Sequence, residues 1–140
     1  MVKVRPYSSQ DYSALSTLYK DKRAYGGTFD ESRDEPTRLL KTSEAGNLYV
    51  AEDDRHIVGS FMILDNPHSF WLLRCVIRPS DNEMTIAQTL FECANSIARE
   101  RGHDSMIVYT DPEDEKLNTR YSEQGFNKAS SYRCYWKEVV

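Results

Sequence analysis

Hydrophobic positions in the second half of the chain repeat with the period of an α-helix. Between residues 83 and 101 they recur at i, i+3, i+4 and i+7, which places them in one stripe along a helix. The stripe consists of Ala87, Leu90, Phe91, Ala94, Ile97 and Ala98. Gly102 follows directly and is a suitable C-terminal stop, because glycine readily adopts the left-handed conformation that ends many helices. The pattern predicts a helix over 83–101 with one buried face.

Helical patterns also occur in three other segments. Residues 8–23 carry a stripe of Tyr12, Leu15 and Tyr19 after a serine pair, either member of which can cap a helix. Pro36 suits the first turn of a short helix that ends near Gly46. Residues 111–125 begin with aspartates that favour a helix start, and they end in a glycine. We therefore expect about four helices.

Short apolar runs rich in β-branched and aromatic residues predict the strands. The first run is residues 2–5, where Val2 and Val4 alternate with Lys3 and Arg5. Residues 47–79 contain three runs broken at Asp53-Asp54 and Asn66-Pro67, as expected for an antiparallel meander. Two further strands are expected, one in residues 104–110 and one in residues 130–139.

The element order is β-α-α-β-β-β-α-β-α-β, and this order indicates an α/β (α+β) fold. We predict a single domain over residues 1–140, with a mixed and mostly antiparallel sheet of about six strands flanked by about four helices. The strand that ends at Pro79 and the strand in residues 104–110 are expected to be joined by a right-handed crossover. A ligand is expected where the strands separate at that crossover.

Composition and charge exclude several classes of protein. The chain has 140 residues, a net charge of −4 and 39% hydrophobic residues, as expected for one globular domain. The net charge argues against a nucleic-acid-binding protein, which usually carries a basic face. The first residues contain no apolar run of signal-peptide length, and no segment approaches a membrane span of about 18 apolar residues. We expect a cytoplasmic protein that binds neither nucleic acid nor membrane.

The cysteines do not indicate a metal site or a disulfide. Cys75, Cys93 and Cys134 are an odd number at wide spacing, without a Cys-x-x-Cys pair or a suitably placed histidine. We interpret them as reduced structural thiols and predict no metal site.

Two segments, CVIRPSDNEMTIAQTL at 75–90 and LNTRYSEQGF at 117–126, resemble the GCN5-related N-acetyltransferases, the GNAT family. In that family a strand ends in a Val-x-Pro-like sequence, here Ile77 to Pro79, and a loop of the form Gln/Arg-x-x-Gly-x-Gly/Ala then opens a helix. The resemblance extends to the element order of nearly the whole chain. It implies the GNAT fold, acetyl-CoA as cofactor and acetyl transfer to an amine.

Counting from Pro79 places the family's loop on Asn82, Glu83, Met84, Thr85, Ile86 and Ala87. In the family, backbone N–H groups at this helix start bind the pyrophosphate of the cofactor, so the resemblance assigns these six residues to cofactor binding. Thr85 stands where the first glycine would be, and its side chain would crowd the phosphate. Glu83 adds a negative charge that would repel it. The alternative is a capped helix start without a ligand.

The resemblance also assigns a catalytic residue and further cofactor contacts. Many family members have Tyr-x-x-x-Gly-Phe near the C-terminus, and this chain has Tyr121 at that tyrosine; it would donate a proton to the departing thiolate. Asp114 stands where the family has an asparagine and is assigned to cofactor binding. Cys75, Val76 and Ile77 would pair with the pantetheine arm through their backbone. A tyrosine on such a helix face is otherwise a core residue.

The predicted reaction is direct attack of a neutral amine on acetyl-CoA. The acceptor is a small-molecule or protein amine, and the sequence does not identify which. No base is obvious: Glu52, His56 and His68 are candidates, and a water chain could replace them. Acidic residues in segment 23–35 suit a cationic acceptor, or they form a solvated loop. They are Asp30, Glu31, Asp34 and Glu35.

A second hypothesis is a catalytically silent GNAT-like module that binds a protein partner. The changed loop motivates it, and the aromatic end segment with Tyr132, Tyr135 and Trp136 could supply an exposed patch. Burial of Trp136 would weaken this hypothesis. A homodimer is compatible with the sequence, and the oligomeric state stays open.

Overall fold

The computed structural model describes residues 1–21, 47–110, 112–130, 133, 135 and 137–139. The expected helix after Pro36, the acidic segment 23–35, Tyr132 and Trp136 lie outside the described residues.

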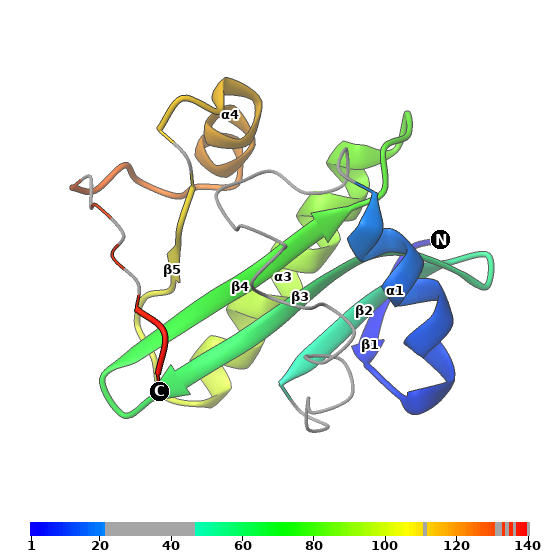
Figure 1. Cartoon of the computed structure of the whole chain (residues 1–140), viewed down its shortest axis with the longest axis horizontal. Helices are drawn as coiled ribbons and strands as arrows, with labels where there is room; N and C mark the ends of the chain where they lie inside the picture. The colour runs from blue at the N-terminus through cyan, green and yellow to red at the C-terminus, as the bar shows by residue number, and fades with distance from the viewer. Residues whose placement is uncertain (22–46, 111, 131–132, 134, 136, 140) are drawn as a thin grey trace.

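Five strands form one sheet in the described part of the chain (Figure 1). They are β1 (Lys3–Pro6), β2 (Leu48–Asp53), β3 (His56–Asn66), β4 (Ser69–Ile77) and β5 (Ile107–Val108). Their order in the sheet is β1-β2-β3-β4-β5, and neighbours run antiparallel except β4 and β5, which are parallel. The predicted α+β fold with a mixed, mostly antiparallel sheet is confirmed.

Helices cover both faces of the sheet. A 3₁₀ helix, η1 (Ser9–Asp11), leads into α1 (Tyr12–Lys20), which lies in front of the sheet in Figure 1, and α3 (Glu83–Glu100) lies behind it. The last helix, α4 (Glu115–Glu123), lies beyond the edge of β4. None of the helices in the described ranges is long and apolar enough to cross a membrane.

The core is divided by the sheet. Leu15 and Tyr19 of α1 pack with Leu48, Val50 and Val76 on one face. The predicted stripe of the long helix packs on the other face, where it contacts Phe61, Phe70 and Leu72 among others. Gly59 permits the close approach of α3, because a Cβ atom at this position would lie 2.9 Å from Leu90 Cδ1.

The long helix ends as its sequence predicts. Gly102 has a φ of +84°, and the N–H groups of Gly102 and His103 donate to the carbonyls of Arg99 and Ala98 at 3.0 and 2.9 Å. These two bonds form a Schellman motif, which satisfies carbonyls at the end of the helix.

The two strands expected near the C-terminus differ from the prediction. Within residues 104–110 only Ile107 and Val108 form a strand. In segment 130–139 the described residues, namely 130, 133, 135 and 137–139, lie in no strand. Both segments have strand-like composition, but this propensity depends on pairing with a neighbour. β5 follows β4 for only two residue pairs and therefore offers a short edge.

Candidate functional site

β4 and β5 separate soon after they meet. Their pairing is limited to Trp71 with Ile107 and Leu72 with Val108, although β4 continues to Ile77. Figure 1 shows β5 and the chain beyond it turning away from β4 toward α4. Residues 73–77 consequently have β3 on one side and no strand on the other within the described chain. Among the described residues, no strand pairs with this edge of β4, which includes Cys75, Val76 and Ile77.

A β-bulge sets the direction of the side chains along this edge. Val76 pairs with Ser60 and Leu73 with Met62, so Arg74 and Cys75 together lie opposite the single residue between them on β3. Arg74 has a φ of +50°, the left-handed conformation that the first residue of a G1-type bulge adopts. After the bulge, Cys75 packs against the core cluster that α3 covers.

The side chain of Tyr121 reaches Cys75 from α4. Its phenol hydroxyl lies close to the Cys75 thiol, and Cys75 packs against the core cluster that contains Tyr121. Burial raises the pKa of Cys75 to about 12, and burial together with the nearby Cys75 raises the pKa of Tyr121. Tyr121 is therefore a neutral phenol at physiological pH, able to donate a hydrogen bond or a proton.

Aromatic packing and a helix stop fix Tyr121. Its ring makes edge-to-face contacts with Phe91 and Phe126, at centroid distances of 5.8 and 5.4 Å. Gly125, with a φ of +88°, and Phe126 donate their N–H groups to Ser122 and Tyr121 at 3.1 and 3.0 Å, forming a second Schellman motif. The ring of Tyr121 thus packs in the core, and its hydroxyl lies next to Cys75 of β4.

The start of α3 lies at the end of β4 and is not capped by a side chain. Asn82 is the N-cap residue, and its φ and ψ of −105° and 13° differ from the extended conformation of most capping residues. Its side chain makes no capping hydrogen bond. In the described part of the chain, no side chain accepts from the N–H groups of Glu83, Met84 or Thr85. These groups are oriented donors at the positive end of a helix.

The other two residues of the assigned loop belong to the core. Ile86 and Ala87 are 1% and 0% exposed, so only their backbone could contribute to a site. Met84 is 55% exposed and Thr85 is also exposed, which leaves the surface of the first turn accessible.

The carboxylate of Glu83 turns toward α4 and is paired. Its Oε2 accepts a hydrogen bond from the Arg120 guanidinium at 3.0 Å and lies 3.5 Å from Lys116 Nζ. Side chains of Arg120 and Glu83 are 15% and 21% exposed, whereas that of Lys116 is 72% exposed. One negative and two positive charges leave this group with a net charge of +1. The expected repulsion of an anion by Glu83 is therefore offset.

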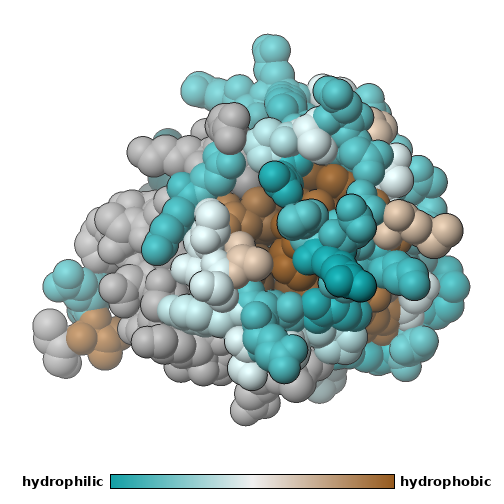
Figure 2. Space-filling model, turned by 90° about the vertical axis from the view of Figure 1, so that its right-hand side faces the viewer, coloured by the Kyte–Doolittle hydropathy of each residue, from teal (hydrophilic) through white to brown (hydrophobic). Residues whose placement is uncertain are grey.

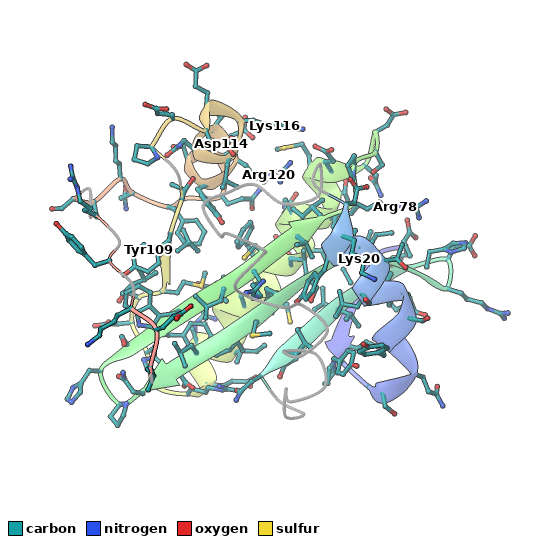
Figure 3. The ribbon with its side chains drawn as sticks, in the orientation of Figure 1. Lys20, Arg78, Tyr109, Asp114, Lys116 and Arg120 are labelled. Carbon is teal, nitrogen blue, oxygen red and sulfur yellow. The ribbon has the colours of Figure 1, made fainter. Side chains whose placement is uncertain are left out.

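More basic residues lie at the same end of the molecule. Figure 3 shows Lys20 at the end of α1 and Arg78 after β4, while Lys116 and Arg120 project from α4. The Arg78 N–H donates to the Val58 carbonyl at 2.7 Å, which fixes the backbone there. Figure 2, which looks at the right-hand side of the view in Figure 1, shows hydrophobic atoms in the middle of that face, with hydrophilic side chains around them.

Asp114 has a structural task in this arrangement. It is the N-cap of α4, and its Oδ1 accepts a hydrogen bond from the Leu117 N–H at 3.0 Å. The helix itself begins at Glu115, directly after this N-cap residue. Sequence reasoning missed Lys116 and Arg120, although their spacing of four places them on one helix face next to Tyr121.

The three candidate bases are not brought together. Glu52 lies on β2 and accepts a hydrogen bond from Arg5 at 3.2 Å. His56 begins β3, and His68 lies in the turn after its opposite end. Across the described ranges, no group of three or more His, Cys, Asp or Glu residues could hold a metal ion.

Solved structures with the same fold include acetyltransferases and a protein described as a transcriptional regulator. The aminoglycoside N-acetyltransferase AAC(6')-Iy in complex with CoA has a TM-score of 0.74 at 16% identity, covering 99% of this chain and 96% of that chain. A predicted acetyltransferase with acetyl-CoA from Clostridium acetobutylicum has a TM-score of 0.66 at 16% identity, covering 100% and 96%. A transcriptional regulator from Bacillus halodurans has a TM-score of 0.73 at 18% identity, covering 97% and 100%.

No model of a protein family matches the sequence, and no curated protein does. The similarity thus lies in the fold, over almost the full length of each chain. The chain has the fold of the GCN5-related N-acetyltransferases.

Proposed function

We propose that this protein is an acetyl-CoA-dependent N-acetyltransferase that transfers the acetyl group directly to an amine. The observation that carries the proposal is the position of the Tyr121 hydroxyl, which lies next to Cys75 of β4 at the edge where β4 and β5 separate. Two solved structures with the same fold contain CoA or acetyl-CoA, and this supports acetyl-CoA as the cofactor.

The described residues fit this cofactor in three places. The edge of β4 at Cys75, Val76 and Ile77 would pair with the pantetheine arm through backbone hydrogen bonds. Donors of the first turn of α3 would hold the pyrophosphate, because they are oriented, positive and uncapped. Arg78 and Lys20 would add positive charge near the phosphates.

Tyr121 would act on the leaving group. Bound acetyl-CoA supplies an acetyl group activated as a thioester. As the amine nitrogen bonds to the carbonyl carbon and the C–S bond breaks, Tyr121 donates its proton to the sulfur, and the amine loses a proton to solvent. The raised pKa keeps Tyr121 protonated in the resting site but makes it a weaker acid, so the transfer depends on the negative charge that develops on the sulfur. Glu52 is paired with Arg5, and His56 and His68 lie at or beside the two ends of β3, so water would accept the proton of the amine.

Amines of two kinds are reasonable acceptors. One similar structure, that of AAC(6')-Iy, is in complex with the bisubstrate analogue CoA-S-monomethyl-acetylneamine, and this supports a small-molecule amine as the acceptor. A lysine side chain of a protein presents the same neutral amine once deprotonated. The acceptor therefore has to be found by screening.

Calorimetric titration with acetyl-CoA tests the cofactor site, and S-acetylpantetheine, which lacks the pyrophosphate, is the matched ligand. We expect acetyl-CoA to bind at micromolar concentration and S-acetylpantetheine at least about tenfold more weakly. CoA release is then measured with aminoglycosides, polyamines and lysine peptides against an amine-free control. Equal affinity for both ligands would show that the start of α3 does not bind the pyrophosphate. Absence of acetyl-CoA binding would contradict the enzyme hypothesis.

The alternative is a silent module with the same fold that binds a protein. A neighbour described as a transcriptional regulator supports it, as does Tyr135, which is 85% exposed in the end segment. This alternative predicts no release of CoA with any amine, even if acetyl-CoA binds.

A further inference from the structure

Glu83 joins the two helices of the site. Its Oε2 contacts the Arg120 guanidinium at 3.0 Å and the Lys116 ammonium at 3.5 Å, so one carboxylate of α3 holds two cations of α4. We propose that Glu83 is a positioning residue that keeps α4 oriented so that the Tyr121 hydroxyl stays on Cys75. The inference rests on the proposed function for its catalytic consequence, but its structural consequence is independent of any activity.

The position of Arg120 in the chain supports this role. Arg120 directly precedes Tyr121, so a rotation of α4 that withdraws Tyr121 from β4 also pulls Arg120 away from Glu83. The pair is partly enclosed, with 15% exposure for Arg120 and 21% for Glu83, and is therefore screened less by solvent than a surface pair. Lys116 is 72% exposed and contributes less.

The contacts of α4 with the described residues outside Glu83 are mostly apolar. The helix is nine residues long, and only Leu117 and Tyr121 are buried. Its ends are closed within the helix itself, by Asp114 at the start and by the Schellman motif at Gly125. The aromatic contacts of Tyr121 hold the helix on α3 but leave rotation about the contact open. The ion pair with Glu83 is a polar contact from another helix that opposes this rotation.

Two interpretations of Glu83 give opposite kinetic results. If its charge only repelled the cofactor, Glu83→Ala would lower KM for acetyl-CoA and leave kcat unchanged. As a positioning residue, Glu83→Ala lowers kcat about tenfold with less than about a twofold change in KM. Glu83→Gln keeps an oxygen that accepts from Arg120, so it retains most of kcat. Glu123→Ala is the matched control, because it removes an exposed carboxylate of α4 outside this contact.

Alkylation of Cys75 provides a readout that needs no activity. In the full chain with Cys93→Ser and Cys134→Ser, a neutral reagent such as iodoacetamide reports the opening of the contact between Cys75 and Tyr121. We expect Glu83→Ala to raise the rate about fivefold, with Glu83→Gln and Glu123→Ala near the parent rate. Circular dichroism checks that each variant is folded.

The outcomes separate the two proposals. Faster alkylation in Glu83→Ala supports the positioning role even if no amine is acetylated, and loss of activity in the parent protein then counts against the proposed function alone. An unchanged alkylation rate in folded Glu83→Ala, or a lower KM with unchanged kcat, would overturn the positioning role.

Discussion

The two helices that meet at Glu83 and Arg120 begin in different ways. At the start of α4, the Asp114 carboxylate accepts from the Leu117 N–H at 3.0 Å. At the start of α3, Asn82 makes no such bond, because its backbone is not in the extended conformation that aims a capping side chain at the first turn. Donors that are satisfied within the chain stabilise a helix, while donors that are left over can bind a ligand.

This difference changes how the loop sequence is understood. Replacement of the family's first glycine by Thr85 suggested a lost ligand site, but the donors of a helix start belong to the backbone and survive such changes. Asp114 looked like a cofactor residue by position, yet its side chain caps α4. The capped helix carries the proposed catalytic residue, and the uncapped helix carries the proposed anion site.

The largest expected effect belongs to the capped helix. Tyr121→Phe removes the hydroxyl and keeps the ring contacts with Phe91 and Phe126, so kcat should fall about 100-fold or more while KM for acetyl-CoA changes little. Steady-state kinetics of CoA release measures this. Tyr109→Phe is the control, because Tyr109 is an exposed tyrosine whose ring centroid lies 5.0 Å from that of Trp71. If kcat of Tyr121→Phe equals that of the parent, the proton comes from elsewhere.

The burial of Cys75 and Tyr121 against one another predicts a loss of stability at high pH. In the folded protein, burial raises the pKa of Cys75 from 9.0 to about 12. Burial also raises the pKa of Tyr121 above its ordinary value. Stability from these groups is fully present below about pH 9 and falls above it, by about 1.4 kcal/mol per pH unit for each proton. Urea unfolding at pH 8 to 11 measures the slope. Cys75→Ala should shift the fall toward pH 10 and above, whereas an unchanged profile would contradict burial of the thiol.

A charge placed at the uncapped helix should weaken binding of the cofactor. Asn82→Asp has nearly the same shape and adds a negative charge beside the free donors, so we expect acetyl-CoA affinity to fall about tenfold. Calorimetric titration measures the change, and S-acetylpantetheine is the control ligand that should be unaffected. Equal losses for both ligands would place the effect outside the pyrophosphate site.

The predictions that the structure confirms are those that depend on neighbouring residues in the sequence. The period of the apolar stripe and Gly102 predicted α3 within one residue at each end, since both signals act inside one helix. The strand expected at 130–139 depended on a partner strand, which composition does not specify. The contact of Glu83 with Arg120 joins residues 37 apart, and no spacing rule reaches that far. Local elements were therefore predictable, and the electrostatics of the site were not.

Loss of the cap on α4 should cost stability and leave the cofactor affinity unchanged. Asp114→Ala removes the acceptor for the Leu117 N–H and should lower the free energy of unfolding by about 1 kcal/mol. Asp114→Asn keeps a capping oxygen without the charge and should cost less. Urea unfolding and titration with acetyl-CoA are measured on both variants. A lower affinity in Asp114→Asn, with stability unchanged, would return Asp114 to the cofactor site as the resemblance first implied.

The smallest effect is expected from restoring the family's glycine to the uncapped helix. Thr85→Gly removes an exposed side chain in the first turn, so an anion can approach the backbone more closely, and we expect acetyl-CoA affinity to rise about threefold. Thr89→Gly makes the same replacement one turn later, beyond the free donors, and should lower helix stability similarly without any gain in affinity. Calorimetric titration of both variants separates a closer approach from a general loosening of α3. If Thr85→Gly weakens binding instead, the Thr85 hydroxyl is itself a donor to the phosphate, and Thr85→Ser should then bind as tightly as the parent protein.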